Sequence, residues 1–448
     1  MIKLSKNLAI LGQFMKGKSE NNQYLFENLE TMLDPKQPLF QLSNTIPWNE
    51  LENYFSQLYS STGRPAKNIR LMISLIILKR IFNLGDETVV EQWIQNPYMQ
   101  YFSGEKTFQW KMPCDPSDLV HFRKRIGEKG VEKIFSVSIE IHKEAVNEEH
   151  ISIDTTVQEK NITFPTDLKL NRKIIWYCLK IAKAANIKLR QSYTITVKKL
   201  IFLQRGKKTA KGRKIAFKAE RHLKTIAGRL ARELTKKLGF LEYKKYDSLF
   251  KLFERLLNQK RESKNKIYSI HESETYCMSK GKEYKQYEFG TKVSLAITNK
   301  SGIIVGAVNI DRNEYDGKTI PATIDQIERI TGKVPKIAGT DQGYRGISNY
   351  KGCLIVNADK LRKKKISIYE RKKIKKLLRR RAGIEAIISS LKNRHRLNKN
   401  YLSGNFGNTI NVMLAAAGFN FKKWMRKIFN FYIYKFKQNI SVFILEKL

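Results

Sequence analysis

Three carboxylates stand at places in the sequence where they could bind metal ions. Asp154 lies inside an alternating apolar stretch, Asp341 ends the stretch KIAGTD before the turn QGYRG, and Glu385 lies in RRRAGIEAIISSLKNRH. Mg²⁺ prefers oxygen ligands and is usually held by a few carboxylates together with substrate phosphates. Two such ions about 3.5–4 Å apart can hold the attacking and leaving oxygens of a phosphodiester. The three acids are therefore the smallest set that predicts a site for two Mg²⁺ ions, in which Mn²⁺ is expected to substitute.

Each of these acids also has an ordinary explanation. A single aspartate in a strand is usually structural, and Glu385 could be a surface residue that pairs with Arg381 or Ser389 on its own helix. Other acids could lie near the same site, and His271 could support it from outside; these acids are Asp167, Glu288, Asp311 and Asp316.

The hydrophobic periodicity around the three acids predicts the elements that carry them. In HISIDTTVQEKNITF, Ile151, Ile153, Thr155 and Val157 alternate with polar positions, which indicates a strand. Further strands are predicted in KIYSIHESE, QYEFGTKVSLAITN, GIIVGAVNI, VPKIAGTD and GCLIVNA. Helices are predicted in TIPATIDQIERITG and, as one long helix, in YERKKIKKLLRRRAGIEAIISSLKNRHRL. Apart from a large insertion after the first strand, this is the order of a ribonuclease H-like α/β fold, and open α/β sheets form sites at the carboxyl ends of their strands.

The charge of the chain indicates a polyanionic partner. Lys and Arg number 85 against 41 Asp and Glu, which gives a formal net charge of +44. Residues 168–266 hold about 30 of these cations against six acids, together with regular Leu, Ile and Phe. A disordered basic tail would lack such apolar residues. We therefore predict that 168–266 is a basic helical insertion with a core of its own.

No stretch of the sequence predicts a membrane span or a disulfide framework. The apolar part of MIKLSKNLAILGQF is too short for a signal peptide, and lysines interrupt IFNFYIYKFKQNISVFIL. The four cysteines are far apart and form no CxxC pair. A reducing compartment and no membrane partner are expected.

The first 135 residues or so are predicted to be helical. NIRLMISLIILKRIFNL indicates a largely buried helix, and GDETVVEQWIQN a second one. In CDPSDLVHFRKRIG, Asp115 is a suitable N-cap, Pro116 suits the first turn, and Gly127 is expected to end the helix. A solvated basic face and a small DNA-binding helical module are both compatible with this helix. Its expected exposed side carries His121, Arg123, Lys124 and Arg125.

Three segments taken together resemble the acidic motifs of the DDE transposases of bacterial insertion sequences. They are SIDTT, GTDQGYRG and RRAGIEAIISSLK, which contain the three acids. The phrases VQEKNITFPTD, SKGKEYKQYEFGTKVS and YLSGNFGNTINVMLAAAGFNFKKW, with PCDPSDLVHFRKRIGEKG near the start, are similar to the insertion-sequence-five group of the insertion-sequence-four superfamily. The resemblance covers about residues 45 to 425.

Spacing and one further signature agree with this resemblance. Glu385 follows Asp341 by 44 residues, which leaves room for one strand and one helix. Asp341 follows Asp154 by 187 residues, which accommodates the helical insertion. The insertion-sequence-four group has a Tyr, Arg, Glu and Lys signature around its last acid. Arg381, Glu385 and Lys392 match it, whereas Leu378 stands in the tyrosine position.

The resemblance implies a transposase that binds terminal inverted repeats of double-stranded DNA, cleaves the strands and transfers them. It implies that Asp154, Asp341 and Glu385 are the catalytic metal ligands for two Mg²⁺. Two DNA ends must be held together, so a homodimer on DNA is expected, in the bacterial cytoplasm at the nucleoid. Residues expected to contact DNA phosphates are Arg381, Lys392, Arg123 and Arg125.

The expected division of the chain has four parts. They are a helical DNA-binding domain at 1–135, a catalytic domain at 145–167 and 267–400, the basic insertion at 168–266, and a helical C-terminal segment at 401–448. Two alternatives stay open on the sequence: a non-catalytic basic DNA-binding protein such as a decayed transposase, and a nuclease without strand transfer. Charge alone fits the first alternative equally well, whereas the three spaced acids favour an enzyme.

Overall fold

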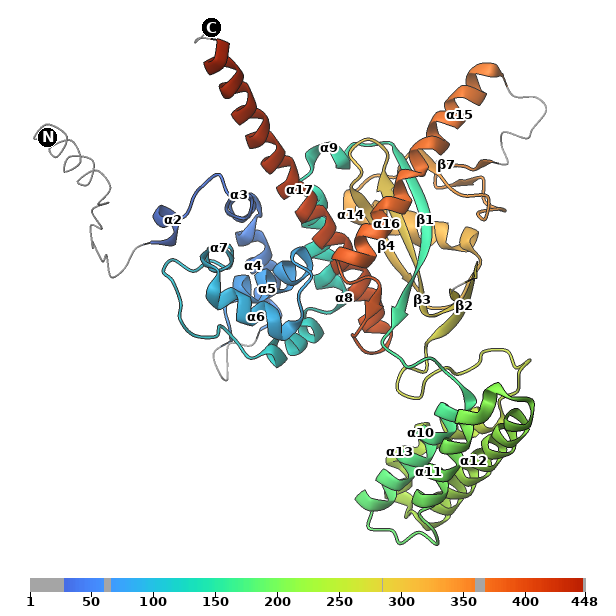
Figure 1. Ribbon diagram of the computed structural model, residues 1–448. Helices are drawn as coiled ribbons and strands as arrows, with labels where there is room; N and C mark the ends of the chain where they lie inside the picture. Colours follow the sequence, from blue (N-terminus) through green and yellow to red (C-terminus); the bar gives the residue numbers. More distant parts are fainter. Residues whose placement is uncertain (1–27, 60–65, 284, 359–366, 446–448) are drawn as a thin grey trace, which may run out of the picture.

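The protein is a mixed α/β chain with a helical N-terminal region. The computed structural model describes residues 28–59, 66–283, 285–358 and 367–445. The N-terminal helices lie on one side of the long helix α17, the sheet lies on its other side, and a separate helical bundle projects from the far end of the sheet (Figure 1). The amino-terminal stretch considered for a signal peptide lies outside the described residues.

The N-terminal region packs around one helix that is buried on nearly every side. This helix is α5, and its apolar residues from Leu71 to Ile81 occupy all of its faces, as the sequence predicts. The capping of α8 is also as predicted, because Asp115 accepts from the Ser117 amide and Asp118 accepts from the Asp115 amide. The helices of this region are α2 (Leu29–Met32), α3 (Pro38–Thr45), α4 (Trp48–Ser56), α5 (Ile69–Ile81), α6 (Asp86–Gln95), α7 (Pro97–Phe102), α8 (Pro116–Glu140) and α9 (Lys143–Val146).

Gly127 ends the first helical stretch of α8, as predicted. Its non-helical backbone (φ 63°, ψ −169°) forms a kink, and a second helical stretch follows directly and runs to Glu140. Glycine adopts this left-handed conformation at little cost because it has no Cβ. The apolar residues Val131, Ile134 and Phe135 are fully buried after the bend, and this burial gives the chain a reason to continue as a helix.

The sheet has the strand order β2-β3-β1-β5-β7-β6, with β4 paired to β3 and β8 paired to β1. Strand β3 is antiparallel to β1, β2 and β4, whereas β5 is parallel to both β1 and β7. The strands are β1 (His150–Lys160), β2 (Tyr276–Lys282), β3 (Lys285–Thr298), β4 (Ile304–Ile310), β5 (Ile337–Gly339), β6 (Asn349–Tyr350), β7 (Cys353–Val356) and β8 (Lys399–Asn400).

One predicted strand is wrong. The stretch KIYSIHESE is not a strand, and β2 begins only at Tyr276. Its apolar residues Ile267 and Ile270 are buried in the core of the helical insertion instead of in the sheet. The alternation of apolar residues correctly predicted that these side chains are buried. The core that buries them, however, is that of the insertion and not that of the sheet.

The last helices cover the sheet and join it to the N-terminal region. Helices α14 and α17 pack against β4, and α17 also packs against α8, α5 and α3. One continuous core accordingly contains N-terminal residues such as Leu39, sheet residues such as Ile153, and α17 residues as far as Phe421. The boundaries proposed between these parts stay predictions. The helices are α14 (Ile320–Thr331), α15 (Ile368–Arg381), α16 (Gly383–Arg394) and α17 (Gly404–Leu445).

A buried polar network fixes α17 against β1. The Gln158 amide donates to Thr291 Oγ1 at 3.0 Å and to Asn309 Oδ1 at 3.1 Å, and its oxygen accepts from Asn411 at 3.0 Å. Buried polar groups are costly unless they are paired, so such a network specifies one arrangement of the elements that contribute to it. It holds the strand that carries Asp154 in a defined place.

Residues 168–266 are helical, as predicted, and bury a second core. Along α12 the buried residues Ala219, Leu223, Ile226 and Leu230 recur every three or four positions, which makes one apolar face. That face packs in a core made only from residues 170–270. The bundle contains α10 (Asp167–Ala184), α11 (Thr194–Phe202), the 3₁₀ helix η1 (Leu203–Lys208), α12 (Ala210–Lys237) and α13 (Phe240–Asn258).

Among the described residues, no helix combines the length and the apolar character that crossing a membrane requires. All four cysteines are unpaired, and three of them are buried.

Candidate active site

Two of the three predicted acids lie close together, beside the end of β5, because their strands are parallel neighbours in the middle of the sheet. Ser152 of β1 pairs with Gly339 of β5. Asp154 lies two residues beyond Ser152, and Asp341 lies two residues beyond Gly339, so both carboxylates leave the paired strands at the same level. The Asp154 side chain is 19% exposed and that of Asp341 is 56% exposed.

A single arginine bridges the two carboxylates. Arg381 Nη1 lies 3.3 Å from Asp154 Oδ2, and Arg381 Nη2 lies 3.7 Å from Asp341 Oδ1. Arg381 is the last residue of α15, where a positive charge also interacts favourably with the helix dipole. The guanidinium therefore offsets part of the negative charge that these neighbouring strands bring together.

Burial dominates the electrostatics of Asp154. It raises the pKa of this carboxyl, and the charges of Asp341 and Asp316 raise it further, against the lowering effects of the Thr155 amide and Arg381. The Thr155 amide donates to Asp154 Oδ1 at 2.8 Å. Excess negative charge at a partly buried site favours any cation that can replace protons there.

A third carboxylate that joins this pair is Asp316, at the start of the 3₁₀ helix η2 (Asp316–Thr319). Its Oδ1 accepts from Thr155 Oγ1 and from Lys292 Nζ, both at 2.9 Å. The sequence marked Asp316 only as one of several acids that could lie nearby. No spacing rule would have selected it, because the contact depends on how the loop after β4 returns over β1.

Tyr344 is a further site residue that the sequence analysis missed. Its ring is fully buried, and burial, with the charges of Asp154 and Asp316, holds the pKa of its hydroxyl well above the usual value. It belongs to the stretch GTDQGYRG, whose glycines explained the turn but gave no role to the tyrosine. Its hydroxyl oxygen is buried beside these acids and has no hydrogen-bond partner among the described residues.

Glu385 is placed differently from the other two acids. It lies exposed in the first turn of α16. The predicted long helix is divided into α15 and α16 at Ala382, but Ala382 keeps helical angles (φ −55°, ψ −26°), so the backbone stays helical across the junction as predicted. Leu377 is the buried residue of α15, which projects from the protein, whereas Ile384 and Leu391 of α16 pack in the main core (Figure 1).

Arg381 and Glu385 lie on either side of this junction. Arg381 contacts Asp154 and Asp341, whereas Glu385 is exposed. Within the residues that the structure describes, no group of three His, Cys, Asp or Glu side chains is arranged to hold a metal ion. The carboxylate oxygens of Asp154 and Asp341 nevertheless suit Mg²⁺ by their chemistry, because it takes oxygen ligands and keeps several waters.

The structure places the residues predicted to contact DNA phosphates in different surroundings. Arg123 was expected on an exposed face, and this is wrong: it is only 4% exposed, and it binds both oxygens of Asp86 at 2.8 and 2.7 Å. The guanidinium is therefore paired with a carboxylate 37 residues away in the sequence. Arg125 is exposed and lies over the Tyr59 ring at 4.5 Å. Lys392 is half-buried on α16.

His271 has no place among the acids. Its Nδ1 hydrogen-bonds Ser269 Oγ at 2.9 Å, and its ring is exposed on the segment that leads from the insertion back to the sheet. A local structural role accounts for it.

Comparison with known proteins agrees with this arrangement. Residues 27–125 match a model described as a transposase domain (DUF772), and residues 260–421 match a model described as a transposase DDE domain. The chain belongs to the DDE transposases of insertion sequences.

A curated relative is an uncharacterised protein, ORF8 in the nfe locus of Rhizobium meliloti. It is 39% identical over 186 residues, which are 40% of this chain and 90% of the relative. No solved structure matches the chain.

Proposed function

We propose that this transposase binds the terminal inverted repeats of its element, cuts the DNA strands there and joins the freed ends to target DNA. The observation that carries the proposal is that Arg381 contacts both Asp154, inside β1, and Asp341, just after the end of the parallel neighbour β5. The strand order β4-β3-β1-β5-β7, with β3 antiparallel and β5 and β7 parallel to β1, supports a ribonuclease H-like fold.

In this proposal Asp154 and Asp341 hold divalent cations, with Glu385 as the third ligand. When bound, two Mg²⁺ ions supply the activation of a water and then of a 3′-hydroxyl, and they stabilise the leaving oxygen. Glu385 does not group with the other two acids in the described structure, so its role as a ligand requires a shift of its side chain or of α16.

Arg381 changes partner in this scheme. Cations at Asp154 and Asp341 would compete with its guanidinium, which then becomes available to a DNA phosphate. Arginine binds phosphate with two parallel hydrogen bonds, and Lys392 would add a point charge further along α16. Arg125 and the exposed cations of the insertion would contribute affinity that depends little on sequence. A homodimer that holds two DNA ends together completes the proposal.

One observation favours a rival function. Because Glu385 does not join Asp154 and Asp341 in the described structure, a DNA-binding protein without catalysis is the second candidate.

A strand-transfer assay separates the candidates. Purified protein is incubated with precut element ends, supercoiled target DNA and Mg²⁺ or Mn²⁺, and joined products are sequenced. Joined ends with a target duplication support the proposal. Cutting of uncut ends without joining would show a nuclease, and DNA binding without either product would show the non-catalytic rival.

A further inference from the structure

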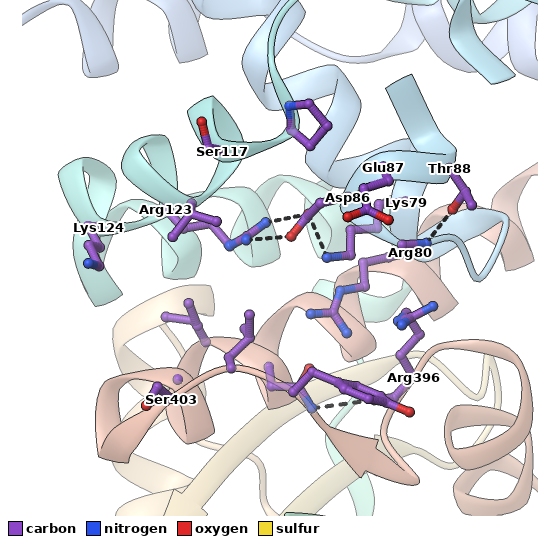
Figure 2. Close-up of a pocket in the computed structure, with 18 of the residues that line it drawn as sticks. Lys79, Arg80, Asp86, Glu87, Thr88, Ser117, Arg123, Lys124, Arg396 and Ser403 are labelled. Atoms are coloured by element: carbon purple, nitrogen blue, oxygen red, sulfur yellow. Dashed lines mark hydrogen bonds and ion pairs between the residues drawn. The ribbon is translucent and has the colours of Figure 1, made fainter. Parts of the chain in front are cut away.

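A second charged cavity lies away from the acids, between the N-terminal helices and the segment that leads into α17. It has a volume of about 880 Å³ and is open to solvent. Helices α5, α6 and α8 form one wall, and residues 396–411 form the other (Figure 2). The family models and the proposed cutting site give this cavity no role.

Three buried cations lie around one carboxylate on the helical wall, and two of them pair with it. Asp86 accepts from Lys79 Nζ at 2.7 Å and from both Nη atoms of Arg123, which approach it from opposite sides (Figure 2). The third cation, Arg80, is only 3% exposed, and Lys79 and Arg123 are 7% and 4% exposed. Lys79, Arg80 and Arg123 against Asp86 leave two positive charges in excess within a buried cluster.

Arg80 is the cation with the least compensation. Its Nε is buried and has no hydrogen-bond partner among the described residues, and its Nη1 donates to the His395 carbonyl at 3.4 Å. The side chain reaches from α5 into the space facing the C-terminal segment (Figure 2). A buried guanidinium donor without a partner is costly, so its retention indicates a ligand that is absent here.

The excess positive charge contributes to lowered pKa values of two cations in the cluster. Burial and the neighbouring charge of Arg80 lower the pKa of Lys79 to about 7, although Asp86 acts in the opposite direction. Burial and the charges of Arg123 and Arg396 lower the pKa of Arg80 to about 9. Both shifts mean that the cluster holds its protons weakly until a negative charge offsets them.

The rim of the cavity adds cations and an aromatic ring. Lys124 is exposed on α8, and Arg396 and Lys399 lie over the Tyr401 ring at 5.6 and 5.9 Å. Tyr401 is 60% exposed, so its ring is accessible beside these charges. Exposed aromatics beside a basic groove are the arrangement on which nucleotides stack.

We infer that this cavity binds a phosphate monoester, and that in the DNA complex the ligand is the 5′-terminal phosphate of a cut strand. A monoester is a dianion at neutral pH and would favour the protonated forms of Lys79 and Arg80 more than an internal phosphodiester, which carries one negative charge. Its tetrahedral oxygens can accept from more than one cation of the cluster. The DNA source of the phosphate rests on the proposed function, but the anion chemistry of the cavity does not.

Two arms of one experiment separate the sources, both in EDTA so that cutting plays no part. In the first arm, thermal unfolding is followed with added inorganic phosphate, with equal ionic strength of chloride as the reference. In the second arm, binding is compared for element ends that differ only in carrying a 5′-phosphate or a 5′-hydroxyl. We expect a phosphate-dependent rise in Tm and about tenfold tighter binding of the phosphorylated end, as for one charge-assisted hydrogen bond.

The variants are Arg80→Met and the double rim variant Lys124→Gln with Lys399→Gln. Replacing the unpaired Arg80 by an apolar side chain is expected to preserve folding and abolish both responses. The rim variant alters exposed residues alone, and it should weaken both responses even if Arg80→Met fails to fold. Lys129→Gln, an exposed change on the same helix as Lys124, is the matched control and should keep both responses.

Three results would contradict the phosphate site or the DNA end as the source of the phosphate. An absent Tm response in the wild-type protein, or one that survives in both the Arg80 and rim variants, overturns the phosphate site. Equal binding of both DNA ends, with the Tm response intact, overturns the DNA end as the source and identifies free phosphate. Because neither arm needs catalysis, failure of the strand-transfer assay leaves both results interpretable.

Discussion

The acidic site at Asp154 and the cationic cavity at Asp86 are arranged with opposite charges. In the first, one guanidinium, that of Arg381, lies between two carboxylates, with Asp316 close by. In the second, one carboxylate lies among Lys79, Arg80 and Arg123. Each region keeps an excess of one charge that its own residues do not cancel. Such an imbalance costs stability in the folded protein, so it marks places where a ligand of the opposite charge completes the site.

The two regions also differ in exposure, and this difference separates their expected behaviour. Asp341 is 56% exposed, so water and ions reach the acids easily. Arg80 is 3% exposed at the base of its cavity, so an anion must enter to meet it. The acidic site should therefore exchange cations readily, whereas loss of a charge in the cavity should mainly affect folding.

The largest effect is expected from removing the acids. Asp154→Asn, Asp341→Asn and Glu385→Gln should each lower DNA cleavage by at least about a thousandfold, because residues that act as a unit lose most of their effect together. DNA affinity in a gel-shift assay should change by less than about threefold, since the basic surface is untouched. Asp247→Asn, an acid on the insertion, is the control. Near wild-type cleavage by any two of the three variants would disprove the site.

The next effect is expected in the cationic cavity. Asp86→Asn should lower the free energy of unfolding by about 3–5 kcal/mol, because Lys79 and Arg123 lose their partner while remaining buried. Urea denaturation measures this, and Glu87→Gln, an exposed change beside it, should cost less than about 1 kcal/mol. Added phosphate should restore part of the loss. A small effect of Asp86→Asn would mean that the cluster tolerates its excess charge.

The acid dependence of stability tests the same carboxylate. Burial alone would raise its pKa, but hydrogen bonds from Arg123 and the charge of Lys79 lower the pKa of Asp86 to about 2. The unfolded chain has the ordinary value near 3.8. The stabilisation is therefore complete above about pH 4 and is lost as the pH falls through about 2. The difference between wild type and Asp86→Asn should shrink over that window.

Substitution of Arg381 is expected to have smaller effects, which are tighter binding of Mn²⁺ and slower turnover. Arg381→Met should raise the affinity for Mn²⁺, measured by electron paramagnetic resonance, by about tenfold, because no internal cation competes for Asp154 and Asp341. The same change, and Lys392→Ala, should lower turnover on pre-bound DNA. Arg380→Met, on the exposed neighbour, serves as control. Unchanged Mn²⁺ affinity in Arg381→Met would show that the arginine does not occupy the cation site.

The smallest effect is expected from substitutions in the insertion, whose positive charges lie on its exposed surface. Replacing Lys214, Lys218 and Arg221 on the exposed face of α12 by glutamine should reduce the salt dependence of DNA binding by about 0.9 per lost phosphate contact. Exchanging lysine for arginine, and arginine for lysine, at the same positions keeps the charge and should keep the slope. An unchanged slope in the glutamine variant would remove the insertion from the DNA-binding surface.

Local sequence determined the elements and the chemical types at the acidic site. The period of apolar residues located β1, β3, β4, α5 and α14 to within a few residues, because each buries one face, or all faces, in a pattern that neighbouring residues define. Helix capping at Asp115 is equally local. The separation of 168–266 into a basic bundle with its own core also follows from local composition and periodicity.

Only the tertiary structure decided which charges meet. Arg123 and Asp86 are 37 residues apart, and Arg80 and His395 are 315 residues apart, so no local pattern shows that the first pair is buried or that the second is in contact. The burial of Ile267 in the insertion depends in the same way on which core its segment joins. Periodicity reports that a residue is buried, but long-range packing chooses its partner, and the partner decides whether a charge is cancelled or left for a ligand.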